Sequence, residues 1–80
     1  MEAFGERVRR LRQRKVMTQT DLAKKAGISI VTVARLENDE GEINPRPATV
    51  RKLAVALEVE PTWLLFGEGA DGQQEKRDVG

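Results

Sequence analysis

The sequence predicts an all-α fold, a compact bundle of five short helices. Apolar residues recur at helical spacing in several stretches, residues typical of helix starts and ends separate these stretches, and no stretch shows the alternation of a β-strand. At 80 residues, with 39% hydrophobic and 34% charged side chains, the chain has room for one small globular domain. We expect this domain at residues 1–67 and a disordered polar tail at residues 68–80.

The first two helices are predicted from apolar spacing and capping residues. Phe4, Val8 and Leu11 recur at i, i+4 and i+7, which indicates an amphipathic helix of about 12 residues. Thr18 lies three residues before an aspartate, as in a capping box with Asp in place of Glu, so the second helix begins at or just after Thr18. Gly27 follows the last apolar residue of that helix and favours the left-handed conformation that ends it.

The third helix is expected from Ile30 to Asn38, with Ser29 as its N-cap and with Val33 and Leu36 on its buried face. A tight turn with glycine joins it to the second helix. Residues 19–38 are therefore expected to form a helix-turn-helix unit, a motif whose second helix enters the major groove in proteins that use it to bind DNA.

The last two helices follow a loop at residues 39–47 that holds two prolines, a glycine and three acids. Pro47 is suited to the first position of the fourth helix. The apolar stripe of that helix consists of Val50, Leu53, Ala54 and Leu57. Pro61 repeats the start signal for a short fifth helix, which we expect to close the bundle. Its apolar residues are Trp63, Leu64, Leu65 and Phe66.

The charge is divided unevenly along the chain. Residues 1–26 carry a net charge of +5 and residues 27–80 carry −4, within a total of +1. This division favours a one-sided surface for a polyanion, although the solvated basic face of an ordinary helix would give the same pattern.

Several classes of function lack their usual residues. The sequence has no cysteine or histidine, and we find no paired acids, phosphate-cradling glycine loop or metal-ligand spacing. We therefore expect no enzyme activity, no cofactor and no metal. The longest uncharged run has nine residues, against roughly 20 for a membrane span, and no signal-peptide pattern opens the chain, so we expect a cytoplasmic protein that does not enter a membrane.

One pattern covers most of the predicted domain. In the helix-turn-helix unit it reads Thr18-Gln19-x-x-Leu22-Ala23-x-x-Ala26-Gly27-Ile28-Ser29-x-x-Thr32-Val33-x-x-Leu36-Glu37-Asn38. With the flanking helices, from about residue 2 to 67, it resembles the phage repressor/Cro-like (XRE-type) helix-turn-helix family. The resemblance implies a lambda-repressor-like fold and a sequence-specific regulator of transcription, with repression as the expected mode, that binds double-stranded DNA.

The resemblance also implies roles for particular residues. Those expected to contact bases are Ser29, Ile30, Val31 and Arg35. Those expected to contact phosphates are Thr18, Gln19, Asn38 and Arg46, with Arg9, Arg12 and Arg14 as possible additions. Arg12 and Glu37 are expected to form a partly buried ion pair that fixes one helix against another.

Alternatives remain for several of these residues. Arg35 suits a bidentate pair of hydrogen bonds with guanine. Ile30 and Val31 could contact thymine methyl groups, or one of the two could pack against the start of the second helix instead. Thr18 could serve only as a cap. The competing interpretation of Arg12 and Glu37 is two independent solvated charges.

The expected partners are double-stranded DNA and a second copy of the chain. A dimer on a palindromic operator would use the fifth helix, or would form only on DNA. The alternative is an antitoxin-like or adaptor module on the same fold, with a protein partner. Three features depart from the family: Val16 replaces a frequent glycine, three acids lie at positions 39, 40 and 42, and Glu60 replaces a good capping residue.

Overall fold

The computed structural model describes residues 2–38 and 45–67 of the chain. Its helices are α1 (Phe4–Arg14), α2 (Gln19–Ala26), α3 (Ile30–Asn38), α4 (Pro47–Leu57) and α5 (Pro61–Phe66). The described ranges contain no strand, so the prediction of an all-α, five-helix fold is confirmed. The acidic segment 39–42 and the predicted polar tail 68–80 lie outside the described residues.

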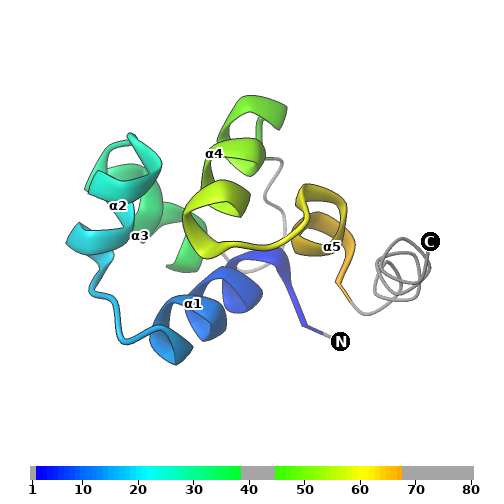
Figure 1. Cartoon of the computed structure of the whole chain (residues 1–80), viewed down its shortest axis with the longest axis horizontal. Helices are drawn as coiled ribbons and strands as arrows, with labels where there is room; N and C mark the ends of the chain where they lie inside the picture. The colour runs from blue at the N-terminus through cyan, green and yellow to red at the C-terminus, as the bar shows by residue number, and fades with distance from the viewer. Residues whose placement is uncertain (1, 39–44, 68–80) are drawn as a thin grey trace.

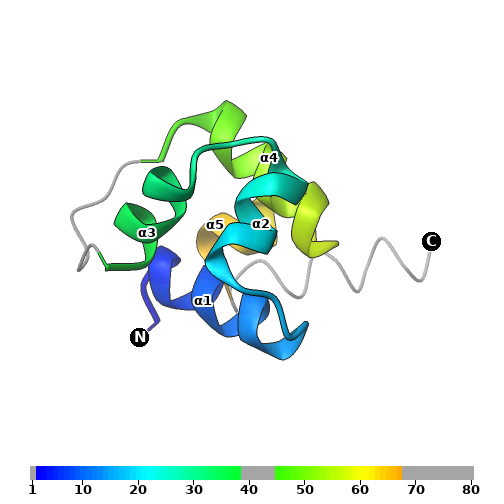
Figure 2. The same ribbon diagram turned by 90° about the vertical axis from the view of Figure 1, so that its left-hand side faces the viewer.

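The bundle has two ends, which α1 and α4 connect (Figure 1). At one end α2 and α3 pack on each other, and at the other end lies α5. α1 contacts α3, α4 and α5, while α4 contacts α2 and α5. Figure 2 shows the end formed by α2 and α3 facing the viewer. The helix-turn-helix unit therefore stands apart from α5.

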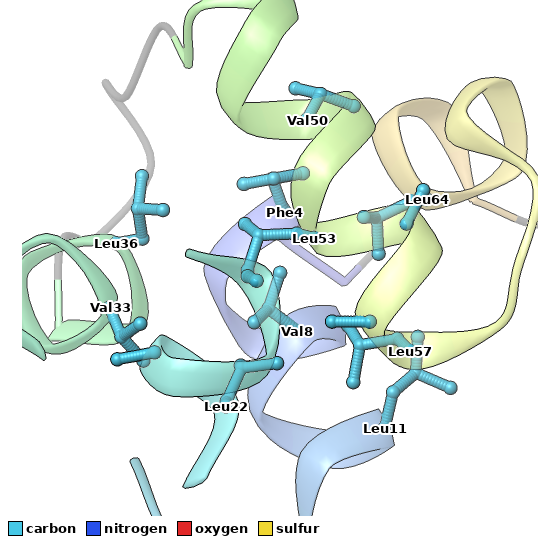
Figure 3. Close-up of a cluster of buried hydrophobic side chains, with 14 of the residues drawn as sticks. Phe4, Val8, Leu11, Leu22, Val33, Leu36, Val50, Leu53, Leu57 and Leu64 are labelled. Atoms are coloured by element: carbon cyan, nitrogen blue, oxygen red, sulfur yellow. The ribbon is translucent and has the colours of Figure 1, made fainter. Parts of the chain in front are cut away.

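Every helix contributes to one hydrophobic core, whose side chains point toward one another (Figure 3). The largest fully buried side chains are Val8, Leu22, Val33, Leu53, Leu57 and Leu64. Burial of each such side chain contributes about 1.5–3 kcal/mol. Because isolated helices of 6 to 11 residues are marginal in water, this core rather than helix propensity holds the fold together.

Three helices end in the same way. A residue in the left-handed conformation follows the helix, and the N–H of the next residue donates to the carbonyl oxygen five positions earlier. The left-handed residues are Val16 (φ 56°), Gly27 (φ 73°) and Glu58 (φ 61°). After Val16, for example, the Met17 N–H donates to the carbonyl oxygen of Arg12 at 3.1 Å, as in a Schellman motif. Gly27 adopts the conformation predicted for it. Val16, exposed and β-branched, adopts the same one at a steric cost.

One close approach between helices requires a glycine. A Cβ atom at Gly5 in α1 would collide with the carbonyl oxygen of Leu36 in α3. The absence of a side chain at Gly5 therefore lets α1 approach the backbone of α3, the helix that carries the candidate base-contacting residues.

Arg7 is buried, which the sequence pattern did not lead us to expect. Its guanidinium donates to the carbonyl oxygen of Leu64 at 2.7 Å and to that of Glu2 at 3.0 Å. The carboxylate of Glu2 accepts two further hydrogen bonds from Arg10, at 2.7 and 3.0 Å. These contacts tie the C-terminal end of α5 to α1.

Candidate nucleic-acid interface

α2 begins with a complete capping box. The hydroxyl of Thr18 accepts a hydrogen bond from the Asp21 N–H at 3.0 Å, and the Asp21 carboxylate accepts one from the Thr18 N–H at 2.9 Å. The hydrogen bond with the Thr18 backbone, and to a smaller extent the one with its side chain, holds the pKa of Asp21 below its ordinary value. Thr18 therefore caps α2. The first N–H groups of the helix have no intrahelical acceptor and favour an anion.

A short turn then aims α3. Beyond the left-handed Gly27, the Ile28 N–H donates to the carbonyl oxygen of Ala23 at 3.0 Å and closes α2. The hydroxyl of Ser29 accepts a hydrogen bond from the Val31 N–H at 3.0 Å, so Ser29 caps α3. Ser29 itself is exposed at the start of the helix.

The outward face of α3 combines apolar side chains with an arginine. Because Val33 and Leu36 are buried, the opposite side of the helix is turned to solvent. Ile30 is 43% exposed and Val31 is 60% exposed, and Arg35 is exposed as well. A hollow of about 390 Å³ lies on this face, lined by Val31, Ala34, Arg35 and Asn38.

Arg12 and Glu37 form an ion pair between α1 and α3. The Nε and Nη2 atoms of Arg12 donate to the two oxygens of Glu37, at 2.7 and 3.0 Å. The Glu37 side chain is only 2% exposed. Arg12 Nη1 donates to the carbonyl oxygen of Met17 at 2.8 Å, and Gln19 Nε2 donates to Glu37 at 3.1 Å. The pair thus joins α1, the entry to α2, and α3.

The remaining candidates lie on the surface. Asn38, at the end of α3, and Arg46, just before α4, are both exposed, and residues 39–44 between them lie outside the described ranges. Arg9 and Arg14 on α1 are exposed too. Arg12, by contrast, is mostly buried and is engaged by Glu37 and Met17.

The hydrogen bond between Gln19 and Glu37 could not be derived from the sequence. The two residues are 18 positions apart, and each was assigned its own separate role. The burial of Arg7 could have been recognised in the sequence. Arg7 lies three residues after Phe4 and so falls on the apolar face that Phe4 forms with Val8 and Leu11.

The described residues offer neither a metal-binding cluster nor a membrane-spanning helix. Among the described residues, no three acidic side chains form a group that could hold a metal ion. None of the described helices has the length and apolar character needed to cross a membrane.

Sequence comparison establishes the class. The sequence model of the family described as Helix-turn-helix matches residues 8–64. The chain therefore belongs to the helix-turn-helix family, and its relatives support the resemblance to the XRE type.

Two curated relatives are named as regulators of transcription. The HTH-type transcriptional repressor RghR of Bacillus subtilis (strain 168) is 39% identical over 69 residues, which are 86% of this chain and 50% of RghR. The HTH-type transcriptional regulator DicA of Escherichia coli (strain K12) is 39% identical over 65 residues, which are 81% of this chain and 47% of DicA. This chain thus spans about half the length of the curated relatives it matches.

A solved structure shares the fold. The P22 c2 repressor, crystallised with a synthetic operator, matches with a TM-score of 0.76 and 31% identity, over 85% of this chain and all of that one. The lambda-repressor-like fold expected from the sequence is confirmed.

Proposed function

We propose that this protein is a sequence-specific regulator of transcription, acting as a repressor, that binds double-stranded DNA by inserting α3 into the major groove. One observation carries the proposal: the outward face of α3 exposes Ile30, Val31 and Arg35 together. Exposed aliphatic side chains contribute little to the fold, whereas on a recognition helix they can contact thymine methyl groups. The names of RghR and of the P22 c2 repressor with its operator support the same function.

The roles of the residues follow from chemistry and position. Arg35 would donate two hydrogen bonds to guanine, and Ile30 or Val31 would contact a thymine methyl group, with Ser29 at the helix start. Thr18, Gln19, Asn38 and Arg46 would bind phosphates on either side and so fix the register of α3. The ion pair of Arg12 and Glu37 serves the fold and touches no base.

We also propose that two copies bind a palindromic operator, on half-sites about 34 Å apart. One such helix reads only a few base pairs, so two are needed for useful specificity. An apolar groove of about 300 Å³ between α4 and α5 supports a contact through α5. Phe66 beside this groove is 66% exposed, and Leu65 is half-buried. Substitution Phe66→Glu should weaken dimers in sedimentation, either of the free protein or of the DNA complex.

Within this proposal, residues 1–67 form the DNA-binding domain and residues 68–80 a polar tail. The protein would act in the cytoplasm. It would have no catalytic role, because its family consists of regulators of transcription.

Selection of bound sites from a random DNA pool tests the proposal. We expect an enriched palindrome whose half-sites include a guanine. Arg35→Ala should lose about 1–3 kcal/mol of discrimination at that guanine only. The matched control Arg9→Ala, on an exposed face of α1, should weaken binding evenly across sequences or leave it unchanged. Equal discrimination by the parent and Arg35→Ala would contradict this reading of α3.

Deoxyuridine, which lacks the thymine methyl group, tests the apolar contacts. Replacing one thymine of the selected half-site with deoxyuridine should weaken DNA binding by the parent. The same replacement should not weaken binding by whichever variant, Ile30→Ala or Val31→Ala, lacks the side chain that contacts that methyl group. If neither variant responds in this way, the two residues do not contact methyl groups.

A salt titration with random duplex separates a DNA-binding regulator from an adaptor module that binds a protein partner. A regulator should lose affinity steeply as salt rises, because phosphate contacts release counterions. Absence of binding at any salt would favour the adaptor.

A further inference from the structure

The amide of Gln19 is hydrogen-bonded to another side chain of the protein. Its Nε2 donates to Glu37 Oε1 at 3.1 Å, and the same oxygen accepts a hydrogen bond from Arg12 Nη2 at 3.0 Å. The acceptor is well ordered by its surroundings, since the Glu37 side chain is 2% exposed and is held at both oxygens. Gln19 itself is half-buried at the start of α2.

A carboxamide group is planar, so fixing one of its N–H bonds fixes the direction of the other. The second N–H of Gln19 remains for another acceptor. Arg12 adds a further constraint, because its Nη1 donates to the carbonyl oxygen of Met17, directly before the capping residue Thr18. One guanidinium thus holds both the backbone that enters α2 and the carboxylate that holds the Gln19 side chain.

We propose that Glu37, held by Arg12, is a positioning residue that aims the amide of Gln19 at a DNA phosphate. This inference rests on the proposed function, in which Gln19 contacts the DNA backbone. It assigns to the ion pair a role in binding, in addition to its role in joining α1 to α3.

Two physical arguments support the assignment. A glutamine that is already ordered loses less side-chain freedom on binding, which is worth roughly a two- to tenfold gain in affinity. The charge of the pair also matters. A lone carboxylate near a phosphate would repel it, whereas Arg12 at 2.7 Å neutralises Glu37 and lets it serve as an acceptor.

The test is a double-mutant cycle in DNA affinity among four proteins: the parent, Gln19→Ala, the double variant Arg12→Met/Glu37→Met, and their combination. Replacing both charges with methionine avoids leaving either one buried alone. We expect Gln19→Ala to weaken binding of the parent by about tenfold, on specific and random duplex alike. In the double variant the same substitution should cost two- to tenfold less. Gln13→Ala, on an exposed part of α1, is the matched control and should have equal effects in both backgrounds.

The outcomes separate the inference from the function on which it rests. If Gln19→Ala costs the same factor in both backgrounds, Glu37 does not position Gln19, although the phosphate contact stands. If Gln19→Ala has no effect on the parent, the phosphate contact fails and the inference falls with it. A salt slope that is unchanged in the double variant would show that Arg12 acts through Glu37, whereas a slope reduced by about one would assign Arg12 a phosphate of its own.

A measurement on the DNA-free parent decides the matter even if the double variant does not fold. Nitrogen-15 relaxation of the side-chain amide groups should show Gln19 restrained and the exposed Gln13 averaged by rotation. Equal mobility of the two amides would overturn the inference.

Discussion

Two arginines of α1, Arg7 and Arg12, tie this helix to opposite ends of the bundle through different partners. Arg12 contacts the carboxylate of Glu37 at 2.7 Å, next to the helix-turn-helix unit. Arg7 donates chiefly to backbone carbonyl oxygens, including that of Leu64 in α5 at 2.7 Å. The same type of side chain therefore makes a buried ion pair at one end and a helix C-terminal contact at the other.

The difference lies in what remains when each arginine is removed. Loss of Arg12 leaves a buried carboxylate without its counter-charge, whereas loss of Arg7 leaves carbonyl groups without their donor. The Arg7 cation also complements the negative end of the α5 helix. The residues nearby differ too, since a left-handed valine, Val16, lies close to Arg12, whereas a glycine with a positive φ, Gly67, lies against Arg7.

The largest effect is expected from Arg12→Met alone, which should lower the free energy of unfolding by about 3–5 kcal/mol because Glu37 is left buried and unpaired. The double variant Arg12→Met/Glu37→Met should recover most of this loss. Urea denaturation of the three proteins measures both values. A double variant as unstable as the single one would show that the charge of Glu37 is not the cause.

Arg7→Met should lower the free energy of unfolding by about 2 kcal/mol, since carbonyl groups in α5 and at Glu2 lose their donor but no buried acid is left behind. The effect should be greatest at α5. Fluorescence of Trp63, the only tryptophan, reports on that helix and should change before the circular dichroism of the whole chain. If fluorescence and circular dichroism of Arg7→Met showed the same unfolding transition, with the midpoint of the parent, this prediction would be contradicted.

Val16→Gly should raise the free energy of unfolding by up to about 1 kcal/mol, because glycine adopts the left-handed conformation without the steric cost that valine bears. Gly67→Ala, at the residue that lies against Arg7, should have the opposite effect on stability. It should destabilise, since its φ is 79° and an added Cβ would collide with Arg7. Thermal melting of both variants provides the comparison, and a destabilised Val16→Gly would show that no strain is relieved there.

The smallest effect concerns pH and the Arg7 end. The hydrogen bond from Arg10, and then the charges of Arg10 and Arg7, hold the pKa of Glu2 below its ordinary value of 4.5. A depressed pKa in the folded state contributes stability above pH 4.5, and this stability is lost as the pH falls through the folded value. Glu2→Gln should therefore cost less than about 1 kcal/mol near neutral pH and nothing at low pH, as denaturation curves at several pH values would show.

The helices were predictable because their signals are local. The capping pair of Thr18 and Asp21, the left-handed Gly27 and the proline at the start of α4 each act within a few residues, and the structure shows all of them. The ion pair of Arg12 and Glu37 was expected only through resemblance to a family, since no local rule links residues 25 positions apart.

The sequence by itself determined five helices, the caps of α2 and α3 and most of the apolar residues that the helices bury, because periodicity and capping depend on neighbouring residues. Only the tertiary structure decided that Arg7 reaches Leu64 and that Gln19 reaches Glu37, across 57 and 18 positions. Such partners are set by how the helices cross, and crossing geometry depends on the packing of the whole core.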